Sequence, residues 1–378
     1  MYISTQDELD AYCEQARACR VIAVDTEFLR EKTYFPRLCL IQVNAGGAIA
    51  AIDPILIEYL TPLASIFEDA DVVKVFHACS QDLEVIFDGM GCTCNNVFDT
   101  QVAAAFLGHR QQIGYGALVE AYTGVSLAKA EALTDWSRRP LDPEQLVYAE
   151  DDVRYLPDIY ESMVSELIER DRLAWVLPEM AEVSDPARYQ KDPADAYLRL
   201  KRAASLTRRQ LAVAREVCRW REETAATRDV PRKWLLSDEV IVELCRRTPT
   251  SLPRLRRIRG LEKSPEGDCR QVIAAIERGL KCAPGDFPAA IKQRARSVSP
   301  DKDGALDLMY AVLRVVADRA GLAPQVIASK DDLADLLAGS EGSRLLLGWR
   351  HEVAGRTLER LLAGELGLTI KDGRIEIL

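Results

Sequence analysis

The chain lacks any apolar run approaching ~18 residues, the length that a membrane-spanning helix needs. It also lacks a basic segment followed by an apolar one at its start, where the acidic stretch MYISTQDELD stands instead. Neither a spanning helix nor a secretory signal is therefore expected. None of the ten cysteines forms a C-x-x-C pair. We expect reduced thiols in a cytoplasmic protein, and the C-x-C pair Cys92 and Cys94 is only a weak metal-ligand pattern.

The composition is that of a globular protein of several domains. Of 378 residues, 48% are hydrophobic and 29% are charged, which excludes disorder and collagen-like repeats. At roughly 100–200 residues per domain, two or three domains are expected.

Charge is unevenly distributed along the chain. The net charge is −10, but residues 1–190 carry −18, residues 191–300 carry +11 and residues 301–378 carry −3. This asymmetry is typical of a protein that holds a polyanion with one part and processes it with another, although basic residues on solvated faces would give the same numbers.

The first half alternates strand and helix patterns, which predicts an α/β domain with a mixed sheet flanked by helices. Strands are predicted at 20–29, 37–43, 47–54 and 71–78, helices at 56–69 and 80–91, and a short strand with a helix within 95–108. Apolar residues at helical spacing predict a long helix over 144–170, which Pro157 should kink or split.

The second half is predicted to be helical up to the final TIKDGRIEIL. We expect an N-terminal domain at 1–183, a linker at 184–204, a helical domain at 205–285, a second linker at 286–302 and another helical domain at 303–378. In each helical part, a long helix leads to a proline and then to a serine that opens the next helix. This pattern indicates one small module used twice, or a chance similarity of helix caps.

Acidic residues stand at three places where the predicted elements could bring them together. Asp25 and Glu27 in AVDTEF are two apart on a strand, so both point to one face. Asp82 lies in the first turns of the helix after strand 71–78, where an acid also complements the helix dipole. Each acid taken alone is compatible with a solvated side chain.

The helical wheel of the third segment, LVYAEDDVRYL, separates its acids. Tyr148 and Asp152 are four residues apart on one helix face, with Asp152 about 60° from the centre of the apolar stripe and Asp151 about 160° away. Asp152 is therefore predicted to face the sheet and Asp151 to face solvent.

Carboxylates from one strand and two helices of an α/β domain can bracket two divalent cations. Two metals about 3.5–4 Å apart suit the in-line attack of water on a phosphodiester, and hard oxygen ligands suit Mg²⁺ or Mn²⁺. The acids thus predict a metal-dependent phosphodiesterase.

These segments resemble the ribonuclease D family of the DEDD superfamily of 3′→5′ exonucleases. VDTEF (24–28), HACSQDLE (77–84) and YAEDD (148–152) are similar to its three exonuclease motifs, the last in the Tyr-x-x-x-Asp form. The helical half, with LAVAREVCRWREETA and VPRKWLLSDEVIVEL, is similar to the helicase-and-RNase-D C-terminal (HRDC) domain. The resemblance covers nearly the whole chain.

The resemblance implies an RNase H-like exonuclease domain followed by all-α HRDC-type domains, two bound Mg²⁺ or Mn²⁺ ions and no organic cofactor. Matched residue by residue, the metal-binding acids are Asp25, Glu27, Asp82 and Asp152. Tyr148 completes the catalytic set, and its neutral phenol is expected to position the attacking water rather than to act as a base.

Substrate binding is expected near the same motifs. Thr26, Phe28 and His77 are candidates, although Phe28 is equally plausible in the core and His77 as a satisfied histidine at the core edge. Trp136, Arg138 and Arg139 in TDWSRRP are candidates for stacking a base or holding phosphate, or else form a solvated loop. Trp220 and Trp234 are expected to pack between helices.

The basic middle part suits contacts with phosphates, which hold RNA without reading its sequence. Its candidate residues are Lys201, Arg202, Arg208, Arg209, Arg246, Arg247, Arg254, Arg256, Arg257 and Arg259.

The resemblance implies a 3′→5′ exoribonuclease that releases nucleoside 5′-monophosphates and trims structured RNA, in particular tRNA precursors with unpaired 3′ ends. A DNA-directed 3′→5′ exonuclease is the alternative with the same chemistry. A non-catalytic RNA-binding protein is less expected, because no acid of the pattern is missing.

Overall fold

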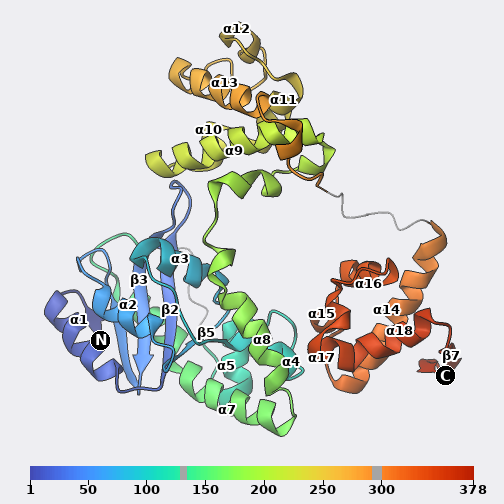
Figure 1. Cartoon of the computed structure of the whole chain (residues 1–378). Coiled ribbons are helices and arrows are strands. Elements are labelled where there is room, and N and C mark those ends of the chain that lie inside the picture. The colour runs from blue at the N-terminus through green and yellow to red at the C-terminus, as the bar shows by residue number, and fades with distance from the viewer. Residues whose placement is uncertain (128–133, 292–299) are drawn as a thin grey trace. The chain divides into compact units, whose positions relative to one another are not determined.

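The computed structural model describes residues 1–127, 134–291 and 300–378 (Figure 1). The chain forms two compact units. The first contains residues 1–29 and 38–185 together with the C-terminal segment from Pro300 on, and the second contains residues 30–37 and 186–291. Much of the second predicted linker, 286–302, lies outside the described residues.

A six-stranded mixed sheet organises the first unit. Its strand order is β1-β4-β3-β2-β5-β6; β3 and β4 are antiparallel, whereas β1–β4, β2–β5 and β5–β6 are parallel. Runs such as RLCLIQV form strands buried on both faces, as expected for a sheet covered by helices. The strands are β1 (Tyr2–Ile3), β2 (Val21–Leu29), β3 (Arg37–Ala45), β4 (Ala48–Ile52), β5 (Val73–Phe76) and β6 (Val97–Asp99). The predicted mixed sheet is confirmed.

Eight helices follow or flank these strands in the first 185 residues that the structure describes. They are α1 (Gln6–Ala16), α2 (Thr61–Glu68), α3 (Ser80–Met90), α4 (Thr100–Phe106), α5 (Tyr115–Thr123), α6 (Pro143–Arg154), α7 (Leu156–Glu169) and α8 (Leu173–Ser184). Helix α6 packs against β2 and β4, and α7 packs against β2 and β5. The long helix predicted over 144–170 is split at Tyr155, because Pro157 fits only the first turn of a new helix.

The second unit is helical and has its own apolar core. Its elements are η1 (Pro186–Arg188), η2 (Pro193–Arg199), η3 (Ala203–Ser205), α9 (Arg208–Arg228), α10 (Arg232–Leu235), α11 (Asp238–Arg247), α12 (Leu252–Leu255), α13 (Glu266–Leu280) and η4 (Pro284–Asp286). The predicted linker 184–204 buries Ala196, Leu200 and Ala203 in the core around α9. These residues lie in or directly after 3₁₀ turns, which are too short to show a periodicity in the sequence.

The first three helices of the C-terminal segment resemble α9, α10 and α11 of the second unit in order and length. The elements of this segment are α14 (Pro300–Ala320), α15 (Pro324–Ile327), α16 (Lys330–Leu337), η5 (Arg344–Leu346), α17 (Gly348–Arg350), the π-turn η6 (His351–Gly355), α18 (Arg356–Leu362), β7 (Leu368–Lys371) and β8 (Arg374–Ile377). The trio α9, α10 and α11 and the trio α14, α15 and α16 both consist of a 21-residue helix, a four-residue helix and a helix capped by a serine side chain, Ser237 or Ser329. This arrangement agrees with a module used twice.

The C-terminal segment shares one apolar core with residues 1–185 of the first unit. Phe106 packs edge-on against Trp349, and Trp175 stacks on Trp349 with ring centroids 5.6 Å apart. Arg350 binds the carboxylate of Glu179 through both terminal nitrogens. None of the helices in the described ranges is long and apolar enough to cross a bilayer.

Candidate active site

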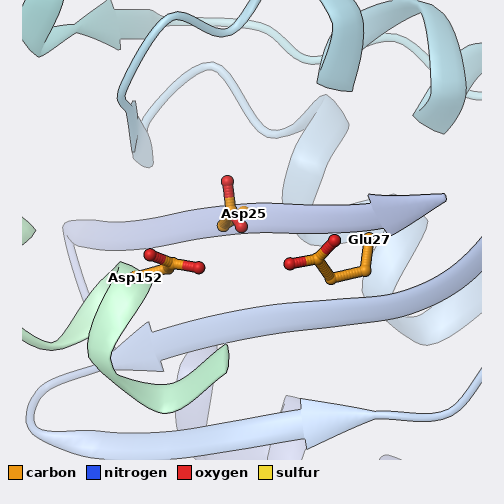
Figure 2. Close-up of side chains that lie close together, drawn as sticks. All are labelled: Asp25, Glu27 and Asp152. Atoms are coloured by element: carbon orange, nitrogen blue, oxygen red, sulfur yellow. The ribbon is translucent and has the colours of Figure 1, made fainter. Parts of the chain in front are cut away.

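Asp25 and Glu27 come from the central strand β2, where residues two apart share a face. Asp25, Glu27 and Asp152 each offer a carboxylate oxygen, and these oxygens all lie within 4.8 Å of one another. Figure 2 shows Asp25 and Glu27 on the same strand, with Asp152 close to them on the end of a helix. Among the residues that the structure describes, this is the only group of three or more potential ligands that could hold a metal ion.

Helix α6 presents the third carboxylate. A capping box between Asp142 and Gln145 fixes its start. Asp152 turns towards the sheet, and the hydroxyl of Tyr148 hydrogen-bonds to its carboxylate. Asp151, one residue earlier, instead pairs with Arg154, with Nε and Oδ1 2.8 Å apart. The orientations predicted by the helical wheel for Asp151 and Asp152 are confirmed.

Asp82 lies close to this group and is held by a neighbour on β2. It is buried in the first turn of α3, and the hydroxyl of Thr26 donates to its Oδ1 at 2.5 Å. The turn before α3 is fixed by Asp99, whose carboxylate accepts from the backbone N–H groups of Ala78 at 3.0 Å and Cys79 at 2.9 Å. Asp82 is not one of the three residues whose oxygens meet within 4.8 Å.

The carboxyl groups of the site have raised pKa values. Burial is the main cause of the raised pKa values of Asp25, Glu27 and Asp152, and the neighbouring carboxylates raise these pKa values further. The pKa rises to about 8 for Glu27 and to about 7 for Asp152, and it lies well above the usual range for Asp25. Burial raises the pKa of Asp82 to about 6, while the bond from Thr26 opposes the rise. Like charges held this closely indicate a site that needs a cation.

The phenol of Tyr148 stays neutral in this environment. Burial and the carboxylates of Asp152, Glu27 and Asp25 raise its pKa above the ordinary value of 10. A neutral O–H close to the carboxylates can hydrogen-bond to a water molecule, but it is a poor base at neutral pH. This agrees with a positioning role.

The three predicted substrate-binding residues lie in different surroundings. Thr26 is buried and uses its hydroxyl on Asp82. Phe28 is half-buried on β2. Both ring nitrogens of His77 have protein partners, since Nδ1 lies 2.9 Å from the Thr100 hydroxyl and Nε2 lies 3.0 Å from the Ile113 carbonyl oxygen.

The TDWSRRP segment is part of the structural support of the site. Trp136 is 5% exposed, with its ring centroid 6.1 Å from that of Tyr148. Arg139 binds the fully buried Asp53 through two nitrogens and also donates to the Cys39 carbonyl oxygen at 2.7 Å. Neither of the two expectations for this segment, contact with a nucleotide or a solvated loop, fits Trp136 and Arg139, because both side chains are occupied within the protein. Arg138 is exposed.

The basic residues predicted to contact phosphates are all exposed on the second unit. Arg254, Arg256, Arg257 and Arg259 follow one another around the short helix α12. Arg247 pairs with Glu243, and Arg208 donates to backbone carbonyl groups.

The two tryptophans of the second unit differ in exposure. Trp220 is buried and donates to Gln271 at 2.7 Å, as the packing role predicts. Trp234 is 60% exposed, so the packing role predicted for it is wrong. It belongs to the four-residue helix α10, which is too short to bury a whole face.

Comparisons with known proteins agree with the class that this geometry defines. Residues 1–168 match the family model described as 3'-5' exonuclease, and residues 210–265 match that of the HRDC domain. A mixed sheet with clustered acids, followed by an HRDC domain, is thus the architecture of a 3′→5′ exonuclease.

Full-length relatives specify the family. The chain is 39% identical to ribonuclease D of Jannaschia sp. over 99% of this chain and 98% of that protein. It is 36% identical to ribonuclease D of Granulibacter bethesdensis over 100% of this chain and 96% of that protein. The crystal structure of Escherichia coli RNase D, described as an exoribonuclease involved in structured RNA processing, matches with a TM-score of 0.84 and 30% identity over 96% of this chain and 98% of that chain.

The chain belongs to the ribonuclease D family and is a 3′→5′ exoribonuclease. Proteins of this family act on RNA, and the exonuclease fold implies divalent metal ions. The three carboxylates of β2 and α6 fit such ions, because hard divalent cations prefer oxygen ligands.

Proposed function

We propose that Asp25, Glu27, Asp82 and Asp152 hold two Mg²⁺ or Mn²⁺ ions and that this site removes nucleoside 5′-monophosphates from RNA 3′ ends. The observation that carries the proposal is the meeting of three carboxylates from β2 and α6 within 4.8 Å. The bound cations would lower the pKa of the attacking water and stabilise negative charge on the phosphate oxygens.

The chain's own residues supply orientation at this site. Thr26 holds Asp82 beside β2, which keeps that carboxylate close to the other three. Tyr148 is anchored on Asp152 and packed by Trp136, so its neutral hydroxyl can position the attacking water. We keep Phe28 and His77 as residues that contact the terminal nucleotide, His77 through its ring face rather than its occupied nitrogens.

The proposed substrates are tRNA precursors and other structured RNAs with unpaired 3′ ends. The exposed arginines around α12, with the other basic residues of the second unit, support contacts with RNA phosphates. Such contacts are independent of base sequence, so selectivity would come from RNA shape and from a free 3′ end.

We also propose the sequence boundaries 1–183, 205–285 and 303–378 for the exonuclease domain and the two HRDC-type domains. The end of α8 at Ser184 supports the first boundary. The core around α9 also includes Ala196, Leu200 and Ala203, so the packed part of the helical unit begins before residue 205. A cytoplasmic location is proposed because all ten cysteines are free, as in a reducing compartment.

The test is a time course of cleavage of a tRNA carrying a 3′ extension. We expect stepwise shortening and release of 5′-monophosphates with Mg²⁺, and no cleavage with EDTA. Asp25→Asn should abolish cleavage while RNA binding persists, because a carboxylate is lost without a change of volume. A matched DNA oligonucleotide should be cut more slowly. Cleavage at the wild-type rate by Asp25→Asn would contradict the metal assignment.

A further inference from the structure

One buried polar side chain, that of Gln42, has no hydrogen-bond partner among the described residues. Gln42 lies in the middle of β3 and is 0% exposed. Within the part of the chain that the structure describes, neither its Oε1 nor its Nε2 has a hydrogen-bond partner. A buried amide without partners loses its bonds to water and gains none in return, so fold stability does not account for its presence.

The neighbours of Gln42 along the strand show which way its side chain points. Asn44 lies two residues further on β3 and therefore on the same face. Its Nδ2 donates to the carbonyl oxygens of Val153 at 3.1 Å and Arg154 at 3.2 Å, both in α6. Gln42 is therefore directed to the face of the sheet that α6 covers.

The partner of Gln42 across the sheet agrees with this direction. Gln42 pairs with Ala51 of β4, and paired residues share a face. Ala51 belongs to one apolar cluster with Leu40 and with Ala149 of α6. On this face of β3, Gln42 lies between Leu40, which shares a cluster with Ala149, and Asn44, which is bonded to Val153. Gln42 therefore lies beneath the turn of α6 between Ala149 and Val153, which is the turn that carries Asp152.

The other neighbour of β3 is the catalytic strand. Strand β2 lies next to β3 in the sheet, and Asp25 and Glu27 face α6 because their oxygens meet that of Asp152. The unpartnered amide of Gln42 is therefore directed to the same space between sheet and helix as the carboxylates. An amide N–H is a natural donor to a carboxylate oxygen.

We propose that Gln42 is a positioning residue of the metal centre: its amide, which has no partner among the described residues, forms a hydrogen bond to a carboxylate of the group Asp25, Glu27 and Asp152 when a divalent cation binds, and so orients that carboxylate towards the cation. The inference rests on the proposed metal site. A ligand that is held by an outer hydrogen bond needs less reorganisation to bind a metal, and removal of such partners typically lowers metal affinity about 10- to 100-fold.

The test compares two amides of the same strand. Gln42→Met removes the polar atoms at nearly constant shape, and Asn44→Leu removes an amide whose bonds to α6 are observed. Mn²⁺ binding is measured by calorimetry on the full chain, and thermal unfolding is measured in EDTA. For Gln42→Met we expect an unchanged or higher Tm in EDTA and an Mn²⁺ dissociation constant about 10- to 100-fold higher. Asn44→Leu should lower the Tm in EDTA.

An unchanged Mn²⁺ dissociation constant in Gln42→Met, whatever its Tm in EDTA, would overturn the role of Gln42. Should Gln42→Met not fold, Gln42→Asn keeps the amide but shortens its reach and should weaken Mn²⁺ binding in the same way. Failure of both variants to fold would assign Gln42 to stability and contradict the proposal. Asp25→Asn serves as the reference, because normal Mn²⁺ binding in that variant would reject the metal site itself.

Discussion

At the scale of single residues, the direction of a side chain decides whether an aspartate of α6 belongs to the site. Asp151 and Asp152 are adjacent in sequence and identical in chemistry, yet only Asp152 joins Asp25 and Glu27. The 100° rotation per residue of α6 separates a carboxylate of the site from one on the surface. Substitution of Asp152 therefore tests the metal site, and the same substitution of Asp151 is its control.

Asp152→Asn should lower kcat/KM by at least ~100-fold, because loss of a metal ligand removes several kcal/mol of transition-state stabilisation and each 1.36 kcal/mol is tenfold. Asp151→Asn should stay within about twofold, since an exposed ion pair contributes about 0.3–0.5 kcal/mol. The measurement is steady-state cleavage of a 3′-labelled RNA oligonucleotide in Mg²⁺. Equal losses in the two variants would reject the orientation of α6.

Tyr148→Phe should reduce kcat by about 10²-fold, the cost of misplacing a reacting group by about 1 Å. The Mg²⁺ concentration for half-maximal rate should hardly change, because the hydroxyl contacts Asp152 rather than providing a ligand charge. A metal titration of the rate checks this, and a large shift of the half-maximal Mg²⁺ concentration would make Tyr148 part of the metal site.

The raised pKa of Asp152 predicts how the metal-free protein responds to pH. The carboxyl titrates near 3.8 when unfolded and at about 7 when folded, so folding favours its neutral form. Its contribution to stability is complete below pH ~4 and is lost as the pH rises to about 7. In EDTA, the Tm of Asp152→Asn should exceed the wild-type Tm by a margin that grows from pH 5 to pH 8. Mg²⁺ should stabilise the wild type more at the upper end. A margin independent of pH would contradict the burial of this charge.

At the scale of elements, the position of α6 depends on a loop that the sequence presents as a polar connection. Arg139 of this loop donates to the carbonyl oxygen of Cys39 in β3. It also binds the carboxylate of Asp53, which directly follows β4. The hydroxyl of Tyr2 in β1 also donates to Asp53. The loop thereby brings Trp136 against Tyr148.

Arg139→Met should lower the free energy of unfolding by about 3–5 kcal/mol, because it leaves the buried carboxylate of Asp53 without its cation. The kcat should fall as well, since Trp136 then loses its anchor beside Tyr148. The double variant Arg139→Met with Asp53→Leu should recover much of the stability. Urea unfolding measures both, and a double variant as unstable as Arg139→Met would indicate that packing, rather than the unpaired charge, dominates.

For the whole molecule, the C-terminal segment belongs to the same core as the exonuclease-like part. Trp349 packs against Phe106 and Trp175, and Arg350 pairs with Glu179. Although all the catalytic acids lie before residue 153, removal of the chain from residue 300 on would expose this apolar surface. We therefore expect such a truncation to be unstable rather than only weaker in RNA binding.

Trp349→Ala should destabilise the protein by about 3–5 kcal/mol, the usual cost of removing a buried aromatic side chain. Trp234→Ala is the matched control, because this tryptophan is 60% exposed and should change stability by no more than about 0.5 kcal/mol. Urea unfolding followed by circular dichroism measures both. Equal stability of the two variants would show that the C-terminal segment is only loosely attached.

The sequence by itself determined the alternation of strands and helices, the break at Pro157 and the facing of Asp25, Glu27 and Asp152, because each follows from the periodicity of a single element. It did not reveal α1, although Thr5 and Glu8 form the capping box that opens it. Only the tertiary structure decided that Arg139 binds Asp53, that Gln42 faces the acids and that Trp349 joins the core. Those contacts pair residues far apart in the chain, and their geometry arises when the sheet and its covering helices pack.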